Sequence, residues 1–378
     1  MTEQTAMFKE RIVSVDVLRG LAMFLILSTQ IGGAHIFSTF NNMVWGEKNW
    51  PDFVINQLSW GNEHVSFINI AQSIFLFIVG VVIPFSIKKR QLKSDKSNIY
   101  LFILKRAAIL FLFGLIAGGK LLNLPQYNRT LATIPIYNNV LEYISISYLV
   151  CSIIVLNTKI RTQYIITGAL LVLYWLVWFI PAPGWDGVIY SKEMNIGIYV
   201  ENLVLGNHSS HFGAWTGVFN TVSHIMLAMT GVLIGHLIFG NREKMDKAKL
   251  LFIVGASMIV VGKICGLFFP IMRCFMTSTF VLISGGIGVL LLAAFYWIID
   301  IKGYSKWAFF FHVFGVNSIA IYMMAHLFDF RLIGNILVGG ISSLFSSNVE
   351  AFIQAVAAMV IMWLIMYYMY CKKTFLKI

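Results

Sequence analysis

The chain has 378 residues, of which 58% are hydrophobic and only 12% are charged, and its mean hydropathy is +0.80. A soluble domain carries about 25% charged residues, so this composition excludes an ordinary soluble protein and predicts an all-α polytopic membrane protein. The net charge of +12 is spread over predicted membrane flanks, and we expect no nucleic-acid partner. The four cysteines have no paired spacing, so neither a disulfide framework nor a zinc site is expected.

Apolar stretches long enough to cross the membrane recur along the whole chain. About 20 residues suffice for ~30 Å of hydrocarbon. No linker, low-complexity run or internal repeat interrupts them, so we expect a single membrane domain over residues 1–378. The predicted spans are about ten: residues 16–37, 66–87, 99–118, 136–156, 163–181, 216–239, 249–268, 275–299, 308–328 and 350–370.

The basic residues predict the orientation of these spans. With a cytoplasmic N-terminus, eighteen lysines and arginines fall in inner segments and six in outer ones. This bias follows the positive-inside rule and predicts that both termini are cytoplasmic. The longer outer loops suggest recognition on that side. Because no large lumenal domain is present, we expect a multi-pass protein of a bacterial inner membrane.

The first predicted span opens with two charged residues. Asp16 and Arg19 stand one helical turn apart in the segment SVDVLRG. An ion at membrane depth is costly unless it is paired, so this arrangement indicates a working site, with Asp16 a candidate catalytic residue and Arg19 a candidate ligand-binding residue. The alternative is a pair that anchors the helix end at the lipid headgroups.

Histidine is the first candidate for proton transfer, because its unperturbed pKa of about 6.5 lies near neutral pH. His64 stands out because the preceding Glu63 can orient its ring as a base or nucleophile. Asn69 and Gln72 follow at helical spacing, which indicates a face turned toward protein or a water-filled cavity. The alternative is an interfacial loop. Five of the eight histidines map to the outer side: His35, His64, His208, His211 and His326.

Other polar residues lie within the predicted spans. Arg106 and Lys263 are candidates for phosphate binding or for pairing with a carboxylate such as Glu142. Asn317 shares a face of the ninth span with other polar residues, and this span ends near His326. Ion pairs and ordinary hydrogen bonds between helices explain the same residues without any substrate.

Taken together, the segments resemble the heparan-α-glucosaminide N-acetyltransferase family and its bacterial relatives. The resemblance covers nearly the whole chain, in order. It is carried by SVDVLRG (14–20), VLEYISISY (140–148), FIPAPG (179–184), Lys263 followed by Arg273 and TSTFVLIS (277–284), NSIAIYMMAH (317–326), and the Lys372–Lys373 pair.

This resemblance implies an integral-membrane acetyltransferase. Family members take acetyl from cytosolic acetyl-CoA and deliver it across the membrane to the amine of a glucosamine residue. The implied co-substrate is acetyl-CoA, the implied acceptor is an amino sugar or related glycan, and no metal is implied. Arg273 joins the implied binding residues. The family's essential histidine lies before the second span; a gapless match puts Ser59 there, and His64 follows five residues later.

Three other functions stay open at this point. An amino-sugar transporter would use the same acidic and aromatic outer groups. An O-acyltransferase of envelope polysaccharide would form an ester in place of an amide. The altered histidine segment also allows a non-catalytic membrane scaffold. The acceptor's identity, the use of an acetyl-histidine intermediate and the presence of a homodimer are equally open.

Overall fold

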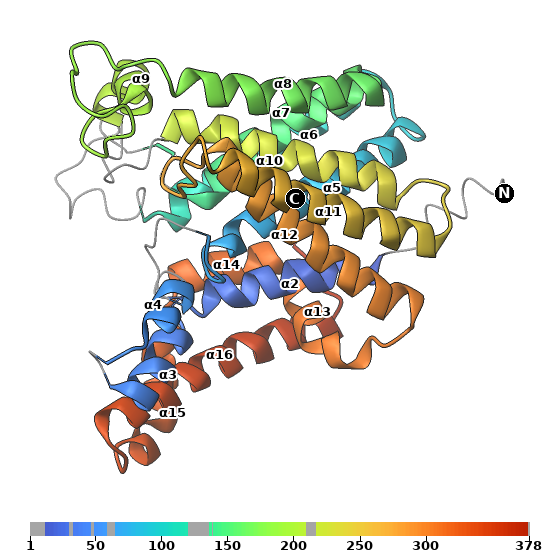
Figure 1. Cartoon of the computed structure of the whole chain (residues 1–378). Helices are drawn as coiled ribbons and strands as arrows, with labels where there is room; N and C mark the ends of the chain where they lie inside the picture. Colours follow the sequence, from blue (N-terminus) through green and yellow to red (C-terminus); the bar gives the residue numbers. More distant parts are fainter. Residues whose placement is uncertain are drawn as a thin grey trace. The chain divides into compact units, whose positions relative to one another are not determined.

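The structure is a computed structural model that describes residues 12–29, 33–46, 49–58, 65–119, 136–137, 139–208 and 217–376. Within these residues every regular element is helical (Figure 1). The predicted all-α architecture is therefore confirmed.

Eight helices are long and apolar enough to cross a membrane, and a ninth span results if one bent pair is counted as a unit. The chain is thus a multi-pass membrane protein by its helix composition, with eight or nine candidate spans among the described residues. The bent pair consists of α13 (Phe309–Val316) and α14 (Ser318–Leu327), which meet at an angle of 65°. The eight are α5 (Ile70–Gln91), α6 (Lys96–Ala117), α7 (Val140–Asn157), α8 (Ile160–Val177), α10 (Gly217–Ile238), α11 (Lys244–Cys265), α12 (Ser278–Phe295) with its extension to Ile301, and α16 (Ser347–Cys371).

The first predicted span, 16–37, differs from the structure. Its helix, α2, runs only from Val13 to Leu27, and a separate helix, α3, covers Ile36–Trp45. The hydroxyls of Ser28 and Thr29 bond back to the carbonyls of Phe24 and Ile26 and so close the last turn of α2. At 15 residues, α2 is shorter than each of the eight candidate spans and is not one of them.

The described residues form two compact units. The contiguous unit holds residues 76–293, and the discontinuous unit combines residues 12–75 with 294–377.

Glycines hold the contiguous unit together where α5 meets α10. A Cβ added at Gly80 would lie 1.9 Å from the carbonyl oxygen of Ala228, and one at Gly231 would lie 2.1 Å from that of Phe77. Only glycine allows two helix backbones to approach so closely. Around this pair, α6 packs on α7, while α10 also contacts α7, α8 and α9 (Ile196–Leu205).

The discontinuous unit has the same device where α2 meets α13. A Cβ at Gly20 would lie 1.7 Å from the carbonyl oxygen of Phe311, and one at Gly315 would lie 1.9 Å from that of Asp16. The rest of this unit is built on α16, which packs on α13, on α3 and on α15 (Phe330–Ser342) (Figure 1). The glycine of SVDVLRG is thus a packing residue.

We predict that Gly315→Ala destabilises the protein while Gly340→Ala does not. The new methyl of the first variant would meet the α2 backbone, and overpacking costs about 1–3 kcal/mol. Gly340 lies in α15 with nothing within 4 Å of its added Cβ, so alanine there only favours the helix. Thermal unfolding in detergent measures both midpoints. Equal midpoints for the two variants would contradict the backbone contact.

Candidate functional site

Two carboxylates surround the beginning of α2. Asp16 Oδ1 lies 3.5 Å from Arg19 Nη1, so the predicted pair is in contact along the helix. Asp300 accepts hydrogen bonds from the backbone N–H groups of Val13 and Ser14, both at 3.2 Å. A carboxylate at a helix N-terminus accepts hydrogen bonds from otherwise unpaired N–H groups, and its negative charge interacts favourably with the helix dipole. Asp300 is absent from the predicted residues, because it reads in the sequence as the polar end of an apolar run.

A polar pocket of about 530 Å³ lies at the C-terminal end of α14 in the discontinuous unit. We call it the histidine pocket. It is lined by residues of the segment between α2 and α3, of the turn between α14 and α15, and of the first turns of α15 and α16. Its polar side chains are His35, His326, Asp329, Arg331, Asn335 and Gln354.

The ring of His326 has a defined tautomer. Its Nδ1 lies 2.9 Å from the carbonyl oxygen of Tyr322 and the two rings are in contact, with centroids 4.2 Å apart. A carbonyl only accepts, so Nδ1 carries the proton and Nε2 of the neutral ring is left as an acceptor. His326 was predicted as a binding residue, and of the predicted residues that the structure describes it alone lines this pocket.

His35 is the N-cap of α3 and has a left-handed backbone, φ 57°. Such a conformation is uncommon for a residue other than glycine and is often found at functional sites. The residue lies outside the candidate spans. Burial, followed by the charge of Arg331, lowers the pKa of the His35 imidazole, and Asp329 partly opposes the shift. At neutral pH the ring is therefore an uncharged base.

The remaining polar residues fix the pocket wall. Asp329 caps α15 by accepting from the N–H groups of Arg331 and Leu332, at 3.0 and 3.1 Å. Gln354 donates to Asn335 Oδ1 at 3.0 Å and so joins α16 to α15. The sequence does carry a signal for this pocket, because Asp329 and Arg331 follow His326 by three and five residues in HLFDFRL.

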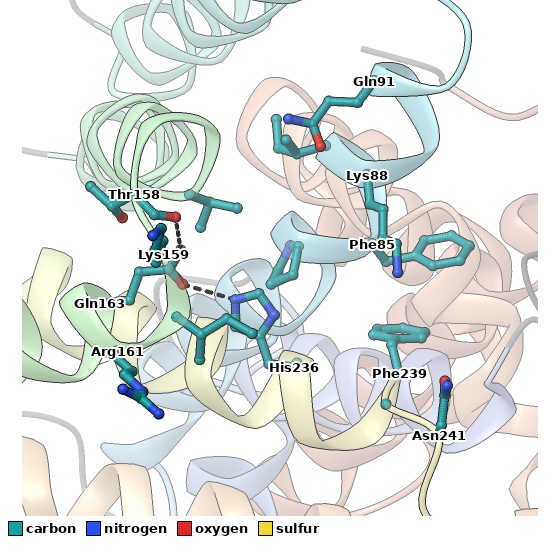
Figure 2. Close-up of a pocket in the computed structure, with 16 residues that line it drawn as sticks. Phe85, Lys88, Gln91, Thr158, Lys159, Arg161, Gln163, His236, Phe239 and Asn241 are labelled. Carbon is teal, nitrogen blue, oxygen red and sulfur yellow. Dashed lines mark hydrogen bonds between the residues drawn. The ribbon is translucent and has the colours of Figure 1, made fainter.

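A second pocket, of about 760 Å³, lies in the contiguous unit. It is formed by the C-terminal ends of α5 and α10 and by the turn from α7 to α8, so three segments predicted to lie on the cytoplasmic side meet there. We call it the basic pocket. Figure 2 shows its side chains, among which Lys88, Lys159, Arg161 and His236 are basic and none is acidic.

Glu142 belongs to a buried polar cluster in the same unit. It is fully buried in the first turn of α7 and accepts the backbone N–H of Tyr137. Glu201, which was not predicted, is also buried and accepts the N–H of Val218 at 3.1 Å. The Tyr143 ring stacks on His224 with centroids 4.4 Å apart. Glu201 thus holds the first turn of α10, and Glu142 holds the segment that precedes α7.

The predicted cations of the contiguous unit are dispersed. Arg106 lies over the ring of Tyr148, 4.6 Å from its centroid. Arg273 is buried between α11 and α12, where burial lowers its pKa to about 10, so it stays charged at neutral pH. Lys263 is exposed in the last turn of α11. None of the three lines either pocket.

The other predicted residues lie in the discontinuous unit or outside the described residues. Asn69 and Gln72 are buried around the start of α5. Asn317 stands at the break between α13 and α14, where it donates to the carbonyl of Thr374 at 2.9 Å and accepts the N–H of Leu376 at 3.2 Å. Its carboxamide therefore tethers the C-terminal segment. The predicted base His64 and its partner Glu63 lie outside the described residues.

Among the described residues, no group of three or more histidines, cysteines or carboxylates is placed to hold a metal ion. In comparisons with known proteins, the chain matches no family model and no curated protein sequence.

We predict that Asp300→Ala lowers the stability of the protein by about 1–2 kcal/mol, because two N–H groups at the start of α2 lose their acceptor. Asp300→Asn keeps one amide oxygen and should lose less. Thermal unfolding in detergent measures both, with the exposed loop variant Asp186→Ala as control. An unchanged midpoint in Asp300→Ala would show that the cap contributes nothing.

Proposed function

We propose that this protein is an integral-membrane acetyltransferase. It moves acetyl from cytosolic acetyl-CoA to the amine of an amino sugar or glycan on the outer side of a bacterial inner membrane. The histidine pocket is the observation that supports this proposal. It combines two imidazoles with carboxamide, carboxylate and guanidinium groups, at a helix end that the distribution of lysine and arginine predicts to be the outer one.

The chemistry requires a base at the acceptor. The lone pair of a neutral amine attacks the thioester carbonyl carbon, the carbon–sulfur bond breaks, and the sulfur leaves as the thiol of CoA. One proton must leave the amine nitrogen, and a neutral imidazole takes it most effectively. His35 has this form at neutral pH. The products are the acetamide and CoA, with no oxidant or metal needed.

Recognition of a sugar fits the other groups of the pocket. Arg331, Asn335 and Gln354 offer several donors to hydroxyl groups, and Nε2 of His326 accepts a hydroxyl proton. The exposed ring of Phe328 supplies apolar surface for a sugar ring. A pocket with a few convergent polar groups and apolar walls is typical of small-molecule sites.

The resemblance adds further residues to the proposal. His64, oriented by Glu63, is the proposed counterpart of the family's essential histidine, and Asp16 with Arg19 occupies the family's first motif. The proposed binding residues also include Asn69, Gln72, Arg106, Glu142, Lys263, Arg273 and Asn317, each at the position described above.

The enzyme is tested with purified protein in liposomes, labelled acetyl-CoA and glucosamine. We expect N-acetylated product, and a loss of kcat of about 10²–10⁴-fold in His35→Gln, as for removal of a general base. His64→Ala is expected to lose product as well, whereas His208→Gln, outside the histidine pocket, serves as control. If no amine or hydroxyl acceptor is acetylated, the proposed acetyltransferase activity is wrong. An ester product would indicate an O-acyltransferase.

The pH dependence tests His35 separately. Because the pKa of His35 is lowered, the base stays neutral to more acidic pH, and the rate should fall only below about pH 6.5. Arg331→Gln removes a charge that lowers this pKa, so the acid limb should move to higher pH. Asp329→Asn removes a charge that raises it, so the limb should move to lower pH, while asparagine keeps the helix cap. Shifts in the same direction would exclude His35 as the base.

A transporter of amino sugars is the second candidate, favoured by the break between α13 and α14. Broken helices form substrate sites in many secondary transporters. This function predicts uptake of labelled glucosamine into vesicles that contain no acetyl-CoA. Uptake without acetylation would favour the transporter, and acetylation without uptake of free sugar would favour the enzyme.

A further inference from the structure

Hydrogen bonds and ring stacking fix the side chains that line the basic pocket. Among its lining residues, His236 donates from Nε2 to Gln163 Oε1 at 2.8 Å, and the amide of Gln163 donates to the carbonyl of Thr158 at 3.1 Å (Figure 2). The rings of Phe85 and Phe239 stack with centroids 4.8 Å apart and join α5 to α10. Gln163 is buried, so this network fixes the inner wall.

The charges at the pocket have one sign. Lys88 comes from α5, and Lys159 with Arg161 comes from the beginning of α8. All three side chains are exposed to solvent. No aspartate or glutamate is among the residues that line the pocket. The pocket therefore favours an anion.

The backbone at the start of α8 adds to this preference. Lys159 is the N-cap of α8, and its side chain makes no capping hydrogen bond. The first backbone N–H to bond within the helix is that of Gln163, so the N–H groups of residues 160–162 precede the helical ladder. Such N–H groups and the helix dipole bind phosphate readily.

We propose that the basic pocket binds a phosphate group. Its volume falls in the range of about 300–1,000 Å³ that is typical of small-molecule sites. The pocket can therefore hold a phosphate group that is part of a larger molecule. Two sources offer that chemistry: a soluble nucleotide such as the phosphorylated part of CoA, and the headgroup of an anionic phospholipid. The assignment of the nucleotide to CoA rests on the proposed acetyltransferase function. The proposed binding of a phosphate group does not depend on that function.

Binding measurements on the purified full chain test the site. Calorimetry with CoA and with dephospho-CoA measures the nucleotide, inorganic phosphate measures the isolated group, and native mass spectrometry with phosphatidylglycerol measures the lipid. The variant is Lys159→Gln with Arg161→Gln, and the matched control is Lys96→Gln, an exposed lysine of α6 outside the pocket. We expect binding of CoA or phosphatidylglycerol to weaken at least tenfold in the double variant, to weaken further with salt, and to be unchanged in Lys96→Gln.

The outcomes separate the sources and the two proposals. Weakened CoA binding supports a nucleotide site, and loss of phosphatidylglycerol alone supports a headgroup site. No binding of any probe, or equal binding by the double variant, overturns the phosphate pocket. If acetyl transfer persists in the double variant with an unchanged KM for acetyl-CoA, the nucleotide source fails while the enzyme stands. If phosphate binds but no acetyl is transferred, the proposed function fails while the pocket stands.

Discussion

The close approach of helix backbones at glycine is the constraint on which each unit of this protein depends. In a membrane the hydrophobic effect does not drive helices together, so packing between small residues takes its place. Gly20 and Gly315 bring α2 onto α13, and Gly80 and Gly231 bring α5 onto α10. The first contact fixes the helix that carries Asp16 and leads to His35. The second fixes two of the helix ends that form the basic pocket.

The fold class was predictable because it depends on local properties. Runs of apolar residues and the spacing of basic residues identify membrane helices without knowledge of their neighbours. The length of the first helix was not predictable in this way. The apolar stretch predicted from hydropathy runs on past Ser28 and Thr29. The helix ends there because the hydroxyls of these two residues donate to carbonyls of its last turn. Hydropathy likewise does not reveal the break at Asn317, because its hydrogen bonds go to residues 374 and 376.

The candidate site was predictable only in part, for the same reason. His326 was found because it ends an apolar stretch on the predicted outer side. Asp300 was missed because its partners, Val13 and Ser14, are almost 290 residues away in the chain. His35 was counted among the outer histidines, but its left-handed backbone and its neighbours from α15 appear only in the folded chain. Interactions between distant segments thus decide which of several similar residues share a pocket.

The tether at Asn317 has a practical consequence for handling the protein. One carboxamide holds the backbone at both Thr374 and Leu376 against the break between α13 and α14. A fluorescent protein or affinity tag fused immediately after Leu376 would pull on this attachment. Fusions after Leu376 therefore need a flexible spacer. Cleavage at a protease site placed upstream of Thr374 would remove both hydrogen bonds to Asn317 and loosen the break between α13 and α14.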